Sequence, residues 1–265
     1  ILMKFGQVDN MDLVDFSLPP ISSRTKKILT NYKSNKKINF YFGAPGWSDM
    51  SYKGIIYPKK TKSKDFLHEY SKQFNSIEVN ATRYGIPKEN VINKWCQSVN
   101  NSFKFSMKLP QFITHRKDIN DDKAKYKIDE FLSLVYKLDK NSGISFAVMA
   151  NYFNSNQIQE LEDFICFWPI DVPLAIELRH SSWFENNMKE HWQTLFLKRN
   201  VIPVVTDTPG RRDVMHFNLS NNQLFVRYVG DFDHPSDHLR INKWIYKIKE
   251  FINLGVNDIW FYVHQ

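Results

Sequence analysis

The sequence predicts a single α/β domain in which eight parallel strands, alternating with helices, close into a (β/α)8 barrel. Its 265 residues match the usual size of such barrels, which run to about 250 residues as one unit. Short β-rich runs alternate with longer segments of helical periodicity, which is typical of repeated βα units and a parallel sheet. The β-rich runs number about eight, the number of parallel strands that closes such a barrel.

The predicted strands are short, mostly apolar runs. They span residues 39–44, 76–80, 103–108, 144–149, 174–179, 202–207, 223–229 and 258–264. The predicted helices repeat apolar residues about every 3.6 positions, often after a polar first residue. They span residues 64–74, 88–99, 125–140, 156–167, 185–199 and 237–254.

The sixth connection, residues 208–222, breaks this alternation. It contains Pro209, Gly210, Arg211 and Arg212, and therefore predicts a loop with at most a short helix. The last predicted strand lies at the end of the sequence, so we expect no closing C-terminal helix in this chain.

Two segments are expected, residues 1–38 as a basic N-terminal lead-in and residues 39–265 as the barrel domain. Basic residues of the lead-in are mixed with Ser and Asn, which is typical of a solvated segment that aids solubility. They are Arg24, Lys26, Lys27, Lys33, Lys36 and Lys37.

Composition indicates a globular protein, because 42% hydrophobic and 15% aromatic residues can fill a large core. No stretch approaches the roughly 20 apolar residues of a membrane helix, and residues 1–16 do not resemble a signal peptide. We therefore expect a cytoplasmic protein with no membrane partner. Cys96 and Cys166 lie in apolar, helix-like segments without a second ligand nearby, which predicts reduced core residues.

Charged residues gather near the carboxyl ends of the predicted strands. Side chains alternate between the two faces of a strand, and Glu78 shares its face with Asn80 while Glu177 shares its face with Arg179. Lys108 lies on the inward face of its strand in the same way. We expect Asp207 and Arg227, late in their strands, to join the same mouth of the barrel.

These inward charges need an explanation, because a buried charge costs several kcal/mol unless it is paired. One hypothesis is a polar pocket at the face where barrel enzymes keep their active sites. The other is an internal salt-bridge lattice, with Glu78 to Lys108 and Glu177 to a neighbouring arginine as the pairs.

Motifs along the chain resemble those of the YecE-like family, known as domain of unknown function 72. They are GAPGWS at 43–48, EVNATRYGIP at 78–87, KLP at 108–110, ITH at 113–115, ELRH at 177–180, SWF at 182–184, DTP at 207–209 and RYVG at 227–230. The resemblance implies a barrel related to the TIM type and brings no established reaction. Two family motifs differ here: Gln-Leu-Pro-Pro after the fourth strand, where Asn151 is the nearby replacement, and a Phe-Asn-Asn ending, where the chain has Val263, His264 and Gln265.

The first functional hypothesis is an enzyme, a hydrolase or isomerase, that acts on an anionic, phosphate-bearing small molecule. Its predicted catalytic residues are Glu78 or Glu177 as general base, with His115 and Asp207 beside them. Lys108, Arg179 and Arg227 would neutralise the anion, and His180 would bind substrate or supply a proton. The other predicted substrate contacts are Trp47, Asn80, Tyr84 and Trp183.

Two alternatives remain open from the sequence. A metal-dependent phosphodiesterase-like barrel, resembling endonuclease IV, would use Glu177, Asp207 and His180, with Glu78, His115 and His264 as further ligands. No cofactor is required by the sequence, and no His-Glu-x-x-His motif occurs. A non-catalytic module would bind nucleic acid by stacking bases on Trp47, Tyr84 and Trp183. Its phosphate contacts would be Lys108, Arg116, Arg211 and Arg212.

Overall fold

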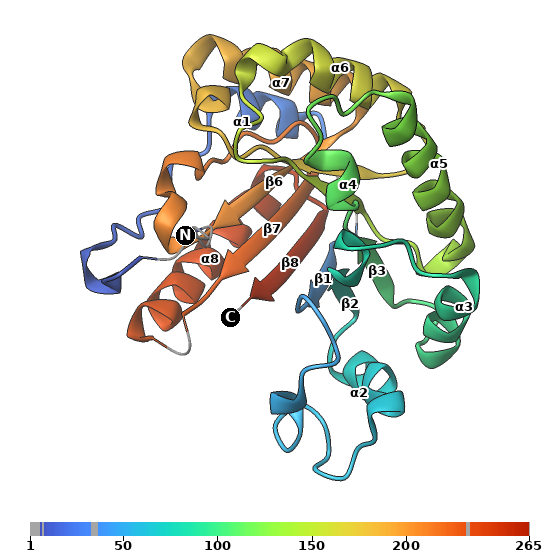
Figure 1. Cartoon of the computed structure of the whole chain (residues 1–265). Coiled ribbons are helices and arrows are strands. Elements are labelled where there is room, and N and C mark those ends of the chain that lie inside the picture. The colour runs from blue at the N-terminus through green and yellow to red at the C-terminus, as the bar shows by residue number, and fades with distance from the viewer. Residues whose placement is uncertain (1–5, 7, 33–36, 232–233, 265) are drawn as a thin grey trace.

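The computed structural model describes residue 6 and residues 8–32, 37–231 and 234–264, and these form an α/β fold with parallel strands (Figure 1). Six strands form one sheet in the order β1-β8-β7-β6-β5-β4, and β2 and β3 form a second. The strands are β1 (Asn39–Gly43), β2 (Ser76–Val79), β3 (Lys104–Met107), β4 (Ser145–Val148), β5 (Leu174–Glu177), β6 (Ile202–Asp207), β7 (Gln223–Val229) and β8 (Asp258–His264).

The two sheets meet at two places without a continuous strand ladder. Between β1 and β2, the Glu78 amide donates to the Ala44 carbonyl at 3.1 Å. Between β3 and β4, isolated bridges pair Phe105 with Ser142 and Lys108 with Phe146. The parallel α/β sheet is thus confirmed, whereas a closed barrel is not, because strands of four residues leave little regular pairing at these junctions.

Gly43 explains how β1 and β2 approach each other. A Cβ atom at this position would lie 2.1 Å from the carbonyl oxygen of Ser76, so only glycine permits this spacing. The hydroxyl of Tyr70 donates to the Ser76 carbonyl and accepts from the Ala44 amide, which ties the same junction to α2 (Phe66–Gln73).

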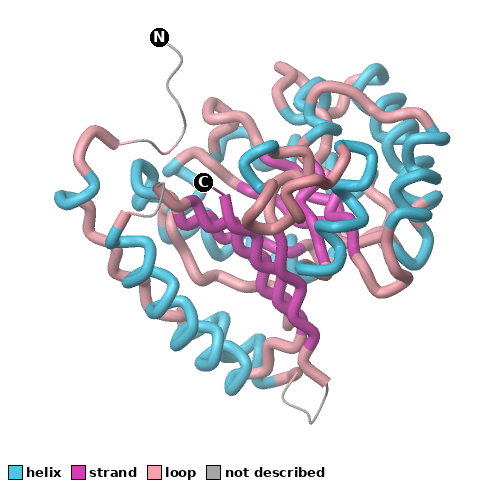
Figure 2. The backbone as a smooth tube through the Cα atoms, turned by 90° about the horizontal axis from the view of Figure 1, so that it is seen from below, coloured by secondary structure: helices cyan, strands magenta, loops and turns pink. Residues whose placement is uncertain are grey.

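Helices flank the strands, as the view from below shows (Figure 2). The longer ones follow the predicted segments, with boundaries that differ by a few residues. They are α2, α3 (Glu89–Ser98), α5 (Asp122–Lys137), α6 (Ile158–Phe167), α7 (Asn186–Arg199) and α8 (Pro235–Leu254). Only a 3-10 helix, Pro209–Val214, stands in the sixth connection, as its turn-forming residues predict.

The N-terminal segment provides a helix at the place that the sixth connection leaves without one. Helix α1 (Ser23–Thr30) lies beside α7 and α8. The Thr25 hydroxyl donates to the Phe217 carbonyl at 3.0 Å and accepts from the Leu219 amide at 2.9 Å. Leu29 is fully buried in the cluster that joins α1 and α8 to the outer face of the sheet. Lys33 and Lys36 of the predicted lead-in lie outside the described residues.

The inner faces of the strands carry an apolar layer with a polar group above it. Phe146, Val204, Phe225 and other apolar side chains fill this layer. The hydroxyl of Tyr262 lies 2.7 Å from the hydroxyls of both Ser76 and Ser106.

Neither cysteine is a fully buried core residue. Both are reduced; Cys96 is half-buried and packs against the main core, whereas Cys166 is exposed, so its expected place in the core is wrong. Within the described part of the chain, no helix is long and apolar enough to cross a bilayer.

Candidate active site at the carboxyl ends of the strands

Four charged side chains from three strands form a buried chain of ion pairs. Arg227 on β7 donates to both carboxylate oxygens of Glu78 on β2, at 2.9 and 2.8 Å. Its third nitrogen donates to Glu177 on β5 at 2.5 Å, and Arg179 donates to the other oxygen of Glu177 at 2.6 Å. The internal salt-bridge hypothesis therefore describes these four residues, except that Glu78 pairs with Arg227 and not with Lys108.

Ion pairing keeps both glutamates charged. Burial alone would raise the pKa of Glu177, but Arg179 and Arg227 lower it to about 2. Burial also opposes ionisation of Glu78, yet Arg227 and His264 hold its pKa well below the ordinary value. Neither carboxylate is suited to accept a proton near neutral pH, because a general base works best with a pKa near the operating pH.

Asn80 and His264 complete the surroundings of Glu78. The Asn80 amide donates to one carboxylate oxygen at 2.9 Å, and His264 Nε2 lies 3.0 Å from the other. Asn80 thus orients Glu78 from the same strand end. Every Glu78 oxygen has at least two polar neighbours, so this side chain holds its position rigidly.

Lys108 lies among these charges without a direct partner. Only 7% of its surface is exposed, and no described residue accepts a hydrogen bond from its amine. Burial and the neighbouring Arg227 lower the pKa of Lys108 to about 7, against the opposing effect of Glu78 and Glu177. Two carboxylates balance two guanidiniums in the cluster, so a protonated Lys108 carries an uncompensated charge.

His115 marks the rim of this site. It follows the short helix α4 (Gln111–Thr114), and its backbone carbonyl accepts a hydrogen bond from the Tyr152 hydroxyl at 2.6 Å. Loss of surrounding water, together with the cations Arg179, Arg83 and Lys108, lowers the pKa of His115 to about 4. The imidazole is therefore neutral at pH 7.

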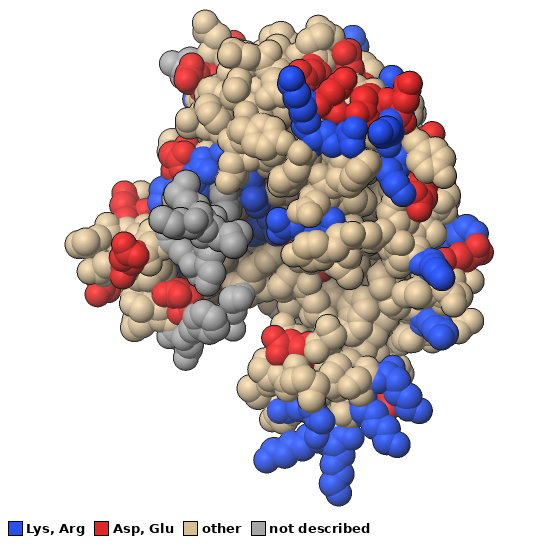
Figure 3. All heavy atoms as spheres, viewed as in Figure 1, with Lys and Arg blue, Asp and Glu red and all other residues tan. Residues whose placement is uncertain are grey.

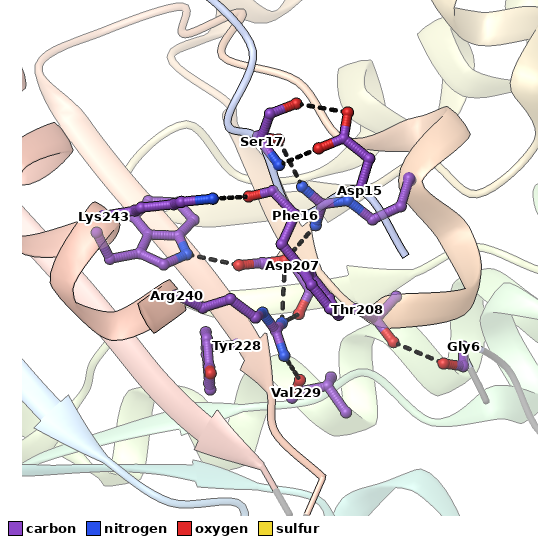
Figure 4. Close-up of polar contacts among 12 residues, drawn as sticks. Gly6, Asp15, Phe16, Ser17, Asp207, Thr208, Tyr228, Val229, Arg240 and Lys243 are labelled. Atoms are coloured by element: carbon purple, nitrogen blue, oxygen red, sulfur yellow. Dashed lines mark hydrogen bonds and ion pairs between the residues drawn. The ribbon is translucent and has the colours of Figure 1, made fainter. Parts of the chain in front are cut away.

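Asp207 does not join this cluster but lies on the other face of β6. Its carboxylate pairs with Arg212 and, at 3.0 Å, with Arg240, and it accepts a hydrogen bond from Trp244 Nε1 at 2.7 Å. The Phe16 ring packs against the Arg240 guanidinium, 4.6 Å from its centre (Figure 4). This arrangement anchors the N-terminal segment to α8 and directs the Asp207 carboxylate toward α8.

The N-terminal segment makes further backbone contacts at this anchor. Arg212 donates to the Ser17 carbonyl at 2.8 Å, and Lys243 donates to the Phe16 carbonyl at 3.3 Å (Figure 4). Gly210 N donates to the Gly6 carbonyl at 2.8 Å.

Other predicted substrate contacts have structural partners. Trp183 is fully buried, and its Nε1 donates to the Phe153 carbonyl at 2.7 Å. His180 accepts from the Ser182 amide at 3.2 Å and so caps a 3-10 turn. Trp47 is half-buried and meets Trp95 edge to face. In this structure Trp183 packs in the core, His180 caps a turn and Trp47 packs against Trp95 while part of its surface stays exposed.

The predicted phosphate contacts Arg116, Arg211 and Arg212 all make contacts within the protein. Arg116 pairs with Asp121, while Arg211 pairs with Asp213 and donates to the Arg179 carbonyl. By contrast, Tyr84 is 79% exposed, and the Arg83 guanidinium lies 5.5 Å from the centre of its ring.

The chain is similar to known proteins over most of its length. Residues 41–265 match the family model described as a protein of unknown function, DUF72. The chain belongs to the DUF72 family. It is 25% identical over 235 residues to the protein YecE of Escherichia coli (strain K12), covering 80% of this chain and 81% of YecE. It is 29% identical over 199 residues to the protein YunF of Bacillus subtilis (strain 168), covering 72% and 70%. Both relatives carry the UPF0759 designation.

Solved structures support the fold alone. A DUF72 family protein from Enterococcus faecalis matches with a TM-score of 0.69 at 17% identity, covering 86% of this chain and 91% of that one. A DUF72 family protein from Thermotoga maritima matches with a TM-score of 0.66 at 19% identity, covering 85% and 92%.

Asn151 and His264 are two of the residues expected to stand where the DUF72 motifs differ, and the structure describes both. Asn151 is exposed in the turn after β4. His264 contacts Glu78, whereas Gln265 lies outside the described residues. His264 therefore takes part in the charged network around Glu78.

The predicted metal ligands are not gathered into one group. Across residues 8–32, 37–231 and 234–264, no cluster of three or more His, Cys, Asp or Glu side chains could hold a metal ion. Glu177 is bound by two guanidiniums, Asp207 faces outward and His180 caps a turn. The donor set of the metal hypothesis is thus used for other contacts.

Arg83 is the site residue that the sequence analysis missed. It stands in the motif EVNATRYGIP, next to Tyr84, and donates to the side chain of Gln111 at 3.2 Å. The adjacent basic and aromatic residues Arg83 and Tyr84 in that motif could have indicated a ligand contact.

Proposed function

We propose that this DUF72 protein is an enzyme that acts on an anionic, phosphate-bearing small molecule at the carboxyl ends of its strands, in a barrel of the TIM type. The observation that carries the proposal is the excess of positive charge around His115. Burial lowers the pKa of this histidine, and the three cations Arg179, Arg83 and Lys108 lower it further.

Charge balance argues for an anionic ligand. Glu78 and Glu177 are matched by Arg227 and Arg179, which leaves Lys108 and Arg83 without carboxylate partners among the described residues. An oxyanion placed between Arg83, Arg179 and His115 would supply the missing negative charge. Charge-assisted hydrogen bonds from guanidinium groups suit a phosphate in particular.

This proposal gives the two glutamates a different role from the general base that the sequence suggested. The two glutamates position Arg227 and Arg179 in this proposal, because both carboxylates are already ion-paired. Proton transfer falls to Lys108, whose pKa of about 7 suits a group that gives and takes protons at neutral pH, while the neutral His115 can hydrogen-bond the ligand.

Calorimetric titration with inorganic phosphate tests the binding part of this proposal. Arg83→Met is expected to weaken phosphate binding at least tenfold, as the loss of a charge-assisted contact implies. Arg24→Met is the matched control, because Arg24 lies on α1 and donates to Thr194, away from the rim. The proposal fails if phosphate does not bind, or if both variants bind it as the wild type does.

The enzymatic part is tested by incubating the protein with a mixture of phosphorylated metabolites and following the phosphorus NMR spectrum. We expect new signals with wild type and Arg24→Met, and none with Lys108→Met. New signals that persist in Lys108→Met at the wild-type rate would refute a catalytic site here.

Nucleic-acid binding is a second candidate, favoured by the exposed Tyr84 ring beside Arg83. Basic side chains also gather on the connection between β1 and α2, in the lower part of Figure 3. They include Lys59, Lys60, Lys62 and Lys64, all exposed. Binding of a single-stranded oligonucleotide that falls steeply with salt and is lost in Tyr84→Ala would favour this candidate over a small molecule.

A further inference from the structure

Lys108 projects from a rigid position. Its backbone amide donates to the Val79 carbonyl at 3.2 Å, and its own carbonyl accepts from the Thr82 hydroxyl at 2.6 Å. The next amide, of Leu109, donates to the Phe146 carbonyl at 2.8 Å. The side chain therefore starts from backbone that is fixed on both sides, on the inner face of β3.

Charged groups surround the amine from each neighbouring element. Glu78 lies on β2, Glu177 and Arg179 lie at the end of β5, and Arg227 lies on β7. His115 faces it from the end of α4. Both carboxylates are already bound by guanidinium groups, and among the described residues neither pairs with the Lys108 amine.

An ammonium group without a partner is costly to bury, so the site favours the uncharged amine. A pKa of about 7 means that roughly half of Lys108 is uncharged at neutral pH, whereas an ordinary lysine is almost entirely protonated. An uncharged amine has a lone pair and is a nucleophile, and desolvation beside another cation is a known way to activate a lysine. An anion-binding role alone would instead require Lys108 to stay charged.

We propose that Lys108 is a nucleophile that forms an imine with the carbonyl carbon of a phosphate-bearing aldehyde or ketone. This inference rests on the proposed function, because Arg83 and Arg179 would hold the phosphate at the rim while the carbonyl reaches the amine. The lone pair of Nζ forms the new carbon–nitrogen bond, and the carbonyl π electrons move to oxygen. The amine then loses its two hydrogens, which leave with that oxygen as water, so no co-reactant is consumed.

Pyridoxal 5′-phosphate, an aldehyde with a phosphate group, serves as the probe, and pyridoxal is its phosphate-free match. After reduction with borohydride, peptide mass spectrometry locates the trapped lysine. We expect labelling of Lys108 at low probe concentration to exceed that of Lys104 at least tenfold. Lys104 is the internal control because it begins β3, which ends just before Lys108, and its amine donates to the Lys140 carbonyl at 2.5 Å.

The matched variants are Lys108→Met and Lys104→Met. Only the first should abolish the selective label, and inorganic phosphate should compete with labelling of the wild type. A second measurement does not depend on the phosphate site: trace acetylation with acetic anhydride should show Lys108 reactivity with a midpoint near pH 7. A midpoint near 10.5, the ordinary value for lysine, would overturn the inference.

Failure of the inference and failure of the proposed function give different results. If inorganic phosphate binds but no reduced adduct forms at Lys108, the imine is refuted and the anion site stands. If Lys108 is trapped equally by both aldehydes and phosphate neither binds nor competes, the nucleophile stands and the phosphate site is refuted. Labelling spread evenly over surface lysines overturns the inference.

Discussion

Replacement of Lys108 by methionine should remove a pH-dependent destabilisation of the folded protein. The lysine has a pKa of about 7 in the folded state and an ordinary value of 10.5. Between these values the unfolded chain binds one more proton than the folded chain, so wild-type stability should rise with pH. The slope is about 1.4 kcal/mol per pH unit, which amounts to about 3 kcal/mol between pH 7 and pH 9.5.

Urea unfolding at pH 7 and pH 9.5, followed by circular dichroism, measures this difference. Urea is uncharged, so it does not screen the site as a guanidinium salt would. Lys108→Met should lose the rise of about 3 kcal/mol and should exceed the wild type in stability at pH 7. Lys104→Met should retain the wild-type pH dependence. Equal pH dependence in Lys108→Met and wild type would refute the account of a buried, partnerless amine.

Two other perturbations test the supporting structure. Glu177→Gln should lower the free energy of unfolding by about 3–5 kcal/mol because it breaks a buried ion pair. The wild type should lose stability as the pH falls from about 4.5 to 2, since the folded-state pKa of Glu177 lies below its ordinary value, and the variant should lose less over this range. Unfolding in urea and by acid would measure both effects, with Glu69→Gln, which breaks the exposed pair with Lys72, as the control. If Glu177→Gln kept the wild-type stability and lost only ligand binding, this prediction would be wrong. Thr25→Val should cost about 1–3 kcal/mol because the Leu219 amide loses a buried acceptor, whereas Thr30→Val, on the exposed side of α1, should cost little. Equal Tm values for these two threonine variants would show that α1 is not integral to the fold.

Periodicity and turn chemistry predicted most of the secondary structure. The strands Ile202–Asp207, Gln223–Val229 and Asp258–His264 have the predicted bounds, because each is an apolar run between clear turn signals. Strand alternation also placed Glu78 with Asn80 and Glu177 with Arg179, since their apolar neighbours fix which face is inward.

Asp207 shows where that reasoning reaches its limit. Strand β6 is buried on both faces, so the alternation of polar and apolar residues that reveals an inward face is missing. Val204 packs in the inner layer, while Asp207 points toward Arg240 and Trp244 on the other face. Helix α1 was not predicted for a related reason. It packs between α7 and α8, where the sixth connection supplies no α-helix, and the local sequence pattern of residues 23–30 does not reveal that position.

The sequence by itself determined the family, the alternating elements and the set of charges at the strand ends, because these follow from local pattern and motif. Only the tertiary structure decided which charges pair. Arg227 takes both glutamates through three nitrogens, and Lys108 is left without a partner. Pairing depends on the distances between β2, β3, β5 and β7, which are far apart in the sequence. Arg227 and Lys108 compete for the same two carboxylates, and the guanidinium group of Arg227 binds both because it has three nitrogens. The amine of Lys108 is therefore the group left to react at the proposed site.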